Sequence, residues 1–416
     1  MTATQLMVAF EGDGAGSGEL SWGQLENWSA IVRLRSWLPL GGIKPLPPGT
    51  TVDEIAGELR YLMSRYQPMR TRLHFGPDGQ PVQVVHASGS IPLEIIEDES
   101  AEDACERYRS SSLDFTNEWP LRMAVIRHDG ELTHMVVLAS HFVTDAAGAV
   151  VMMREVAAME SAPVAGMQPL EQARWQRSAA GQRQHAAAAR HWESILRSIP
   201  LRRFATSAVK PHPRYRRGQL DSPSLAGSVQ RLASGVDSSA VLLTLFSLAL
   251  HEVCGADPVV VRPLVGNRFR PGLAGVVCTA AQAGLCVLDV AGLPWSDALA
   301  VVSKASMTAY KHAYFDPAAM ALLHEEVSRA RGETVDIACF FNDRRTGVAS
   351  ASTGPSRFEW VLERDSPPLE QLIVDVEDLP HGLRLTIHMD AHAVSPADGE
   401  RLLRTMERLA ADYAND

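Results

Sequence analysis

At 416 residues, the chain is longer than the size at which one hydrophobic core keeps growing, so two lobes are expected. Hydrophobic residues make up 46% and charged residues 21%, which is typical of globular proteins and excludes a disordered chain. The net charge of −10 excludes bulk electrostatic binding of nucleic acid or of an anionic membrane.

Cysteine usage and apolar stretches indicate a cytoplasmic protein. The cysteines are odd in number and widely spaced, which predicts reduced thiols and no metal site; they are Cys105, Cys254, Cys278, Cys286 and Cys339. The N-terminus lacks the basic and apolar regions of a secretory signal. The most apolar later stretch, Ala240–Leu250, is too short to span a membrane.

The first half of the chain interleaves predicted strands and helices. In order, these are a strand at Gln5–Phe10, a surface loop at GDGAGSG, a helix within 19–38, a helix at Thr51–Tyr66, a hairpin of 69–75 and 81–87, a helix at Ala101–Ser110 and a hairpin over 121–141. Thr51 or Asp53 is the expected cap of its helix. Asp129-Gly130 favours the tight primed turn of the last hairpin, whose second strand ends at His141.

A helix is predicted at Ala146–Met159, with Asp145 as its N-cap. Residues 166–198 carry one long helical pattern, and 205–220 form a connector rich in Pro and Arg. The second half predicts helices at Ser238–Val253, Trp295–Ala313, Pro317–Arg331 and Pro396–Tyr413, and strands at Pro258–Pro263, Cys286–Asp289, Asp336–Phe341, Leu372–Glu377 and Leu383–Met389. The pattern indicates two α/β or α+β lobes, at 1–175 and 216–416, joined by a connector at 176–215.

His141 is the residue whose role matters most. A histidine that ends an apolar strand is more often a core residue than a catalyst. Asp145, four residues later at a strand-to-helix turn, would need a cationic or N–H partner if it is buried. From these residues alone, a structural and a catalytic interpretation both stay open.

The stretch Ser140-His141-Phe142-Val143-Thr144-Asp145-Ala146 resembles the His-His-x-x-x-Asp-Gly signature of the condensation domains of nonribosomal peptide synthetases, members of the chloramphenicol acetyltransferase-like acyltransferases. Further stretches resemble this family in its order, and they are LSWGQLENW, RYQPMRTRL, LVGNRFRPGLAGVVCTAAQAGLCVLDV, CFFNDRR and MDAHAVSPADGERLLRTMERLAADY. The resemblance spans nearly the whole chain. With no attached carrier or adenylation domain, the chain resembles a free-standing member.

The resemblance implies two acetyltransferase-like lobes in a V-shaped pseudo-dimer with a central tunnel. His141 would act as general base, or would position the nucleophile and stabilise the tetrahedral intermediate. Asp145 would pair with Arg268 to shape the site, and Asn342 would orient the acceptor. The acyl donor would be a thioester on the phosphopantetheine of an acyl or peptidyl carrier protein, and the acceptor a small or carrier-bound amine or alcohol. No bound cofactor or metal is implied.

Two departures keep other functions open. Ser140 replaces the first histidine, although its hydroxyl can still bind backbone, and Ala146 replaces a glycine, which matters only if that position needs a positive φ. One alternative is a degenerate, non-catalytic domain that binds a carrier protein or recruits an enzyme. Another is a coenzyme A-dependent O- or N-acyltransferase. The basic stretch Lys210–Arg217 fits either a docking patch for an acidic carrier or a solvated linker.

Overall fold

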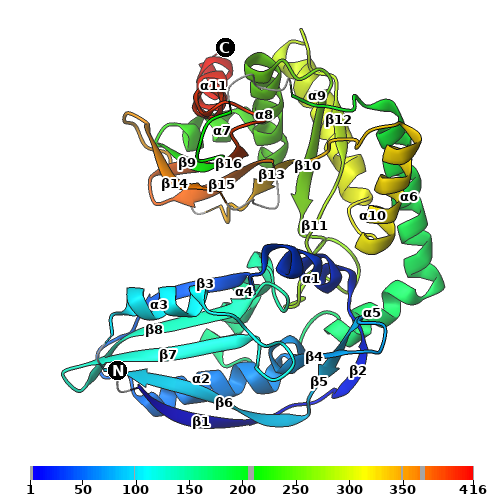
Figure 1. Ribbon diagram of the computed structural model, residues 1–416. Helices are drawn as coiled ribbons and strands as arrows, with labels where there is room; N and C mark the ends of the chain where they lie inside the picture. Colours follow the sequence, from blue (N-terminus) through cyan, green and yellow to red (C-terminus); the bar gives the residue numbers. More distant parts are fainter. Residues whose placement is uncertain (1–2, 98, 205–209, 348–349, 366–370, 416) are drawn as a thin grey trace. The chain divides into compact units, whose positions relative to one another are not determined.

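The computed structural model describes residues 3–97, 99–204, 210–347, 350–365 and 371–415 (Figure 1). The chain divides into two compact units. Unit 1 comprises Met1–Arg183 and Gly266–Ala281, and unit 2 comprises Gln184–Val265 and Gln282–Asp416. The sequence placed 266–281 in the C-terminal lobe, whereas this segment packs with unit 1. The V-shaped arrangement and its tunnel stay a prediction.

Unit 1 is built on a five-stranded mixed sheet. Its strand order is β1 (Ala3–Glu11), β6 (Ser88–Ile96), β7 (Leu121–His128), β8 (Glu131–Ser140) and β3 (Pro39–Pro45). Only the β6–β7 pair of this sheet is parallel. A smaller antiparallel sheet has the order β2 (Gly16–Glu19), β5 (Pro81–Val85) and β4 (Thr71–Phe75). The end of β8, where His141 follows, therefore lies beside the edge strand β3.

Unit 1 also contains several helices. They are α1 (Trp22–Leu34), α2 (Val52–Arg65), the 3₁₀ turn η1 (Gln67–Arg70), α3 (Ala101–Ser110), α4 (Ala146–Ala158) and α5 (Pro169–Arg177). Helix α2 packs against β1 and β6 through Ile55, Leu59 and Met63, which recur every four residues (Figure 1). Helix α3 packs against β3, β7 and β8.

Local signals predicted most of unit 1 correctly. Thr51 caps α2 in a capping box with Glu54, and both Asp129 and Gly130 have the positive φ of the primed turn. Two predictions were wrong. The glycine-rich loop contains β2, which pairs with β5. The long helical pattern breaks at Ser178, whose extended backbone separates α5 from α6 (Ala179–Ser198).

Unit 2 contains an eight-stranded mixed sheet. The path runs β11 (Gln282–Ala283), β10 (Val259–Val265), β13 (Cys339–Asp343), β15 (Leu372–Leu379), β16 (Gly382–Asp390), β9 (Tyr215–Ser222) and β14 (Arg357–Arg364), and β12 (Cys286–Leu288) also pairs with β10. The remaining helices are α7 (Leu225–Leu232), α8 (Ser238–Cys254), α9 (Trp295–Lys311), α10 (Pro317–Ala330) and α11 (Pro396–Asn415).

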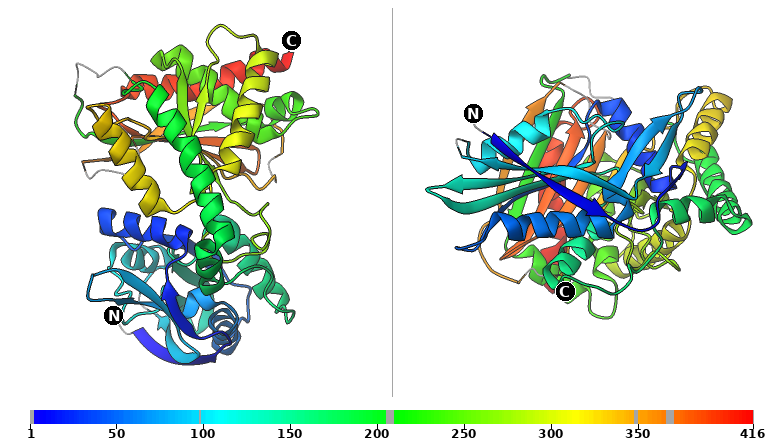
Figure 2. Two further views of the ribbon diagram at one scale, coloured as in Figure 1. Left: turned by 90° about the vertical axis from the view of Figure 1, so that its right-hand side faces the viewer. Right: turned by 90° about the horizontal axis from the view of Figure 1, so that it is seen from below.

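Helix α8 explains the most apolar stretch of the sequence. Every residue from Ala240 to Leu250 is buried, because α8 lies in the core between the sheet and other helices. Helix α11 packs beside it (Figures 1 and 2). In the described part of the chain, no helix combines the length and apolar character needed to cross a bilayer.

The connector predicted at 205–220 is partly wrong. Residues 205–209 lie outside the described residues, but Tyr215–Ser222 form β9, which pairs with both β14 and β16. The arginines there conceal the alternation, because Leu220 and Ser222 face the core while Arg217 and Asp221 lie on the other face.

Candidate functional site

His141 directly follows the last residue of β8, and the residue before the edge strand β3 holds its backbone. Its N–H donates to the carbonyl of Leu38 at 2.9 Å. The preceding Ser140 is fully buried; its hydroxyl donates to the Trp37 carbonyl at 2.7 Å and accepts the Phe142 N–H at 3.2 Å. Ser140 thus satisfies its own polar group in place of a histidine and supports the turn that presents His141.

The Asn27 side chain holds the His141 imidazole. Its amide nitrogen lies 3.1 Å from Nδ1 of His141, 2.7 Å from the backbone carbonyl of His141 and 3.0 Å from Oγ1 of Thr279. These contacts join helix α1, the end of β8 and the segment 266–281. One side-chain amide, that of Asn27, therefore contacts both the ring and the backbone carbonyl of His141.

The LSWGQLENW stretch places Asn27 by anchoring helix α1 at its start. Ser21 and Gln24 form a reciprocal capping box, and the Gln24 amide also donates to Gln83 at 3.1 Å. Next to Asn27, Trp28 packs edge-on against Phe115 and Phe142, at centroid distances of 5.5 and 6.4 Å. Phe142 is fully buried and adjoins His141, so this aromatic cluster fixes α1 relative to the histidine.

Asp145 is the centre of a second set of contacts, here named the Asp145 cluster: Asp145, Arg268 and the backbone N–H groups of Gly148, Ala280 and Ala281. Arg268 donates to both carboxylate oxygens, at 2.5 and 3.1 Å. The three backbone N–H groups donate to the same carboxylate at 2.9 to 3.2 Å. The side chains of Asp145 and Arg268 are only 4% and 16% exposed, respectively. The buried charge of Asp145 is therefore both paired and hydrogen-bonded.

The segment 266–281 closes over the turn between β8 and α4. The Thr144 hydroxyl donates to the Val277 carbonyl at 2.8 Å. At Gly148, a Cβ would lie 2.1 Å from that same carbonyl oxygen, so only glycine allows this approach. The pairing that the sequence predicted between Asp145 and Arg268 is thus part of a broader attachment of this segment to the His141 turn.

Ala146 does not need a special backbone. It is the first residue of α4, it is exposed, and its φ is not positive. The methyl group that replaces the glycine of the signature therefore points into open surface rather than straining the turn.

The RYQPMRTRL stretch holds α4 against α2. Arg65 donates to Glu155 at 2.8 Å, and the Tyr66 hydroxyl donates to the same carboxylate oxygen at 2.7 Å. Burial first, and then the nearby Glu155, raise the pKa of Tyr66 well above its usual value. Arg70 is 1% exposed and donates to the carbonyls of Asp13 and His86. Arg65 and Arg70 therefore have structural roles in unit 1.

Asn342 lies in unit 2, on β13. Its amide donates to Asp375 at 2.7 Å, and Nε2 of His388 lies 3.5 Å from the other oxygen of Asp375. Asn342 is therefore a member of a polar group on three neighbouring strands of that sheet. Its role in orienting an acceptor stays a prediction.

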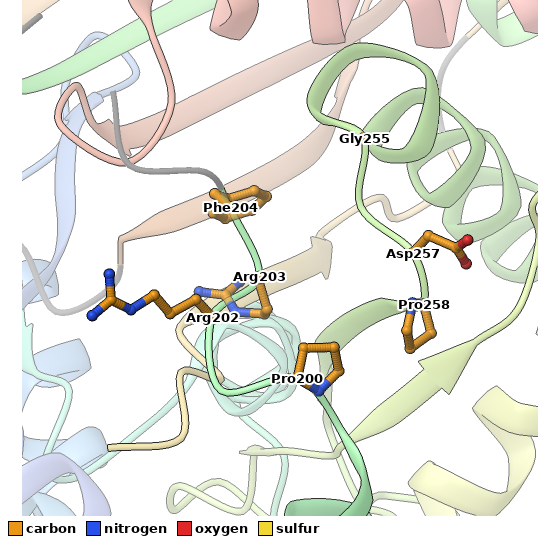
Figure 3. Close-up of a pocket in the computed structure, with 7 residues that line it drawn as sticks. All are labelled: Pro200, Arg202, Arg203, Phe204, Gly255, Asp257 and Pro258. Atoms are coloured by element: carbon orange, nitrogen blue, oxygen red, sulfur yellow. The ribbon is translucent and has the colours of Figure 1, made fainter. Parts of the chain in front are cut away.

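Unit 2 also contains a pocket of about 410 Å³, lined by Pro200, Arg202, Arg203, Phe204, Gly255, Asp257 and Pro258 (Figure 3). Arg202 already pairs with Glu333, and Arg203 with Asp336, both at 2.6 Å. Figure 3 shows the Asp257 carboxylate pointing away from Arg202. Both arginines of this pocket are therefore engaged in ion pairs, and we assign the pocket no chemistry.

Sequence reasoning missed Asn27 and Thr279 as neighbours of His141. Both lie within stretches that carry the family resemblance, LSWGQLENW and LVGNRFRPGLAGVVCTAAQAGLCVLDV. Only the fold brings these positions, 252 residues apart, within hydrogen-bond distance.

Comparison with known proteins identifies the family of the chain. The model of the Condensation domain family matches residues 46–283, more than half of the chain. Cyclosporin synthetase from Tolypocladium inflatum is 26% identical over 54% of this chain, and tyrocidine synthase 3 from Brevibacillus parabrevis is 26% identical over 53%. The chain spans only 2% and 4% of the length of these two relatives.

Solved structures match nearly the whole chain. The condensation domain of the monacolin K polyketide synthase MokA superposes with a TM-score of 0.75 at 15% identity, covering 97% of this chain and 99% of that one. The X-domain from teicoplanin biosynthesis gives a TM-score of 0.71 at 17% identity, covering 95% of both. These matches establish the fold and confirm the predicted mixed α/β class.

Proposed function

The chain belongs to the Condensation domain family, and from this premise we propose that it is an acyltransferase that joins an acyl thioester to an amine or hydroxyl acceptor. The donor is an acyl group on the phosphopantetheine of a carrier protein, and the protein itself needs no bound cofactor. The observation that carries this proposal is the constraint on His141, whose ring is held by Asn27 and whose turn is held by the Asp145 cluster. Contacts to both the ring and the turn hold the imidazole in one orientation, which a catalytic group needs.

Each residue has a distinct role in this proposal. His141 contacts the reacting atoms, and Ser140 and the Asp145 cluster keep its turn in place. Asn342 is proposed to orient the acceptor. Bond formation follows addition and elimination: the acceptor attacks the thioester carbonyl and the oxyanion forms. As the carbonyl is restored, the C–S bond breaks, and the leaving thiolate takes up the proton that the acceptor loses. Because the donor is already activated as a thioester, the reaction needs no nucleotide.

A non-catalytic binding module is the second candidate. Two observations favour it: Ser140 departs from the signature, and the X-domain, which shares this fold, was solved in a complex with OxyB. Such a module would bind a carrier protein or an enzyme of the same biosynthetic locus.

Intact-protein mass spectrometry of an acyl-loaded carrier protein distinguishes these functions. The carrier is mixed with candidate amines and alcohols and with wild type, His141→Ala or His134→Ala. His134 is a matched control, because it lies on β8, the strand that His141 follows, and is half-buried. We expect acyl transfer by wild type and by His134→Ala, and a loss of at least about 100-fold in His141→Ala.

Other outcomes decide against the proposal in separate ways. Carrier binding without transfer by any variant favours the binding module. Transfer from acyl coenzyme A but not from the carrier identifies a coenzyme A-dependent enzyme. Full transfer by His141→Ala means that His141 has no catalytic role.

A further inference from the structure

The side chain of Gln282 forms a reciprocal pair of hydrogen bonds with the backbone of Phe315. Its Oε1 accepts the Phe315 N–H, and its Nε2 donates to the Phe315 carbonyl, both at 3.1 Å. Because the N–H can only donate and the carbonyl can only accept, the orientation of the amide is unambiguous. Gln282 and Phe315 are each only 2% exposed, so loss of this side chain would leave two buried backbone groups unpaired.

Phe315 lies in the turn between α9 and α10, which is fixed by its neighbours in unit 2. Its ring packs edge-on against Trp192 of α6, at a centroid distance of 5.1 Å. The next residue, Asp316, caps α10 by accepting two N–H groups of its first turn, at 3.0 and 3.2 Å. This turn therefore gives Gln282 a rigid point of attachment.

Gln282 is the first residue of unit 2 after the segment 266–281 of unit 1. It begins β11, which is only two residues long and pairs with the end of β10 (Figure 1). In this ladder Gln282 pairs with Val265, the residue directly before the segment, so the two ends of 266–281 meet at one residue pair. So short a ladder supplies few hydrogen bonds, and the two side-chain bonds to Phe315 are a substantial part of the attachment.

The two residues before Gln282 are bonded to the Asp145 carboxylate. The N–H groups of Ala280 and Ala281 donate to its Oδ2 at 3.0 and 3.2 Å. Neighbouring Cα atoms are about 3.8 Å apart, so a shift of Gln282 is passed directly to these two N–H groups. Hydrogen bonds weaken steeply as they are bent, and a small shift is enough to weaken both.

Thr279, one residue earlier, reaches the other support of the histidine. Its Oγ1 lies 3.0 Å from the amide nitrogen of Asn27, and that amide contacts the His141 ring and carbonyl. The short stretch 279–281 therefore touches both side chains that hold His141 and its turn, and its next residue is anchored in unit 2.

We propose that Gln282 is a positioning residue for His141 that acts through the stretch 279–281. Its two hydrogen bonds to Phe315 hold this stretch against Asn27 and Asp145. The role rests on the proposed function, because the position of His141 matters through the acyl transfer that it serves. Loss of the anchor should displace the histidine by a fraction of an ångström, which lowers the rate of the chemical step more than it weakens substrate binding.

Hydrogen exchange of backbone amides, measured by mass spectrometry with residue-level fragmentation, tests this coupling without substrate. Gln282→Met keeps the length of the side chain but forms neither hydrogen bond. In this variant the N–H groups of Ala280 and Ala281 should exchange at least about 10-fold faster than in wild type. The N–H of Gly148 also donates to Asp145, but it belongs to α4, so its exchange should stay at the wild-type rate.

Arg331→Met is the matched control in unit 2. Arg331 donates to the carbonyls of Leu196 and Ile199, both at 2.7 Å, so this variant also loses two hydrogen bonds to buried residues. It should lower Tm while leaving exchange at 280–281 and kcat unchanged. Equal acceleration of exchange at 280–281 in Arg331→Met and Gln282→Met would overturn the proposal, because a general loss of stability would then explain both.

Kinetics of acyl transfer give a second readout. Gln282→Met should lower kcat about 10-fold with KM little changed. Gln282→Glu tests the hydrogen bonds themselves: a protonated carboxyl can accept from the Phe315 N–H and donate to its carbonyl, whereas a carboxylate can only accept. Its kcat relative to wild type should therefore rise as the pH falls from about 9 to about 6, since burial favours the protonated acid. The same ratio for Gln282→Met should not change.

The remaining outcomes separate this role from the proposed function. A ratio for Gln282→Glu as low and as flat as that for Gln282→Met would overturn the positioning role. Unchanged exchange at 280–281 in Gln282→Met, with full acyl transfer, would overturn it as well and leave the acyltransferase standing. No transfer by wild type refutes the proposed function, while the exchange experiment still decides whether Gln282 holds this stretch.

Discussion

Replacing Asp145 by asparagine removes the centre of the Asp145 cluster. The carboxylate accepts two hydrogen bonds from Arg268 and three from backbone N–H groups. Asparagine keeps one accepting oxygen and turns an NH₂ group toward donors that faced the second oxygen. The Arg268 guanidinium, 16% exposed, then has lost its counter-charge.

The size of the effect follows from burial. Removing one partner of a buried ion pair costs about 3–5 kcal/mol, and the partial exposure of Arg268 favours the lower end. For a unit of roughly 200 residues, each kcal/mol lowers Tm by about 2–4 °C, so about 3 kcal/mol corresponds to about 6–12 °C. Acyl transfer should fall as well, since the His141 turn loses its support.

Differential scanning calorimetry measures this change against a matched control. Glu97 of the same unit also pairs with an arginine, Arg127 at 3.1 Å, but its side chain is 54% exposed. Glu97→Gln should cost less than about 1 kcal/mol. A loss for Asp145→Asn no larger than that for Glu97→Gln would refute the reasoning. Arg268→Met combined with Asp145→Asn should cost less than the sum of the single changes, because both remove the same pair.

Two further predictions concern Ala146, which departs from the family signature, and His191 in unit 2. Ala146→Gly, which restores the signature glycine, should leave acyl transfer within about twofold, because Ala146 is exposed without a positive φ; a large gain in a transfer assay would show that the methyl distorts the site. Burial lowers the pKa of His191, which stacks on His312 at 4.6 Å. The unfolded chain, with its histidine pKa near 6.5, then binds the proton more readily. The free energy of unfolding should therefore fall as the pH drops below about 6.5, by up to about 1.4 kcal/mol per pH unit for this group. His191→Gln should flatten that slope in urea denaturation at pH 5 to 7.5, and an unchanged slope would contradict this assignment.

Some elements are specified by local chemistry within their own segments. The capping box at Thr51, the Asp129-Gly130 turn and the Asp145 cap lie within the segments that they shape, so short-range patterns predict α2, the β7–β8 hairpin and α4. The ordered motifs also identified the family and singled out His141.

Elements that depend on distant partners were decided only by the tertiary structure. β2 lies in a glycine-rich stretch and gains its backbone partners from β5, and β3 pairs at a sheet edge with Gly41 at a φ of 121°. β9 resembles a basic linker until its pairing with β14 and β16 separates its two faces.

The same holds for the candidate site. The sequence supplied His141, Asp145 and Arg268, but no local pattern reports that 266–281 packs with unit 1. That packing brings Thr279 to Asn27, and the packing of α1 brings Asn27 to His141. A hydrogen bond between residues far apart in sequence depends on the folding of all the chain between them, so the histidine was identified from sequence, whereas its contacts with Asn27 were determined by the fold.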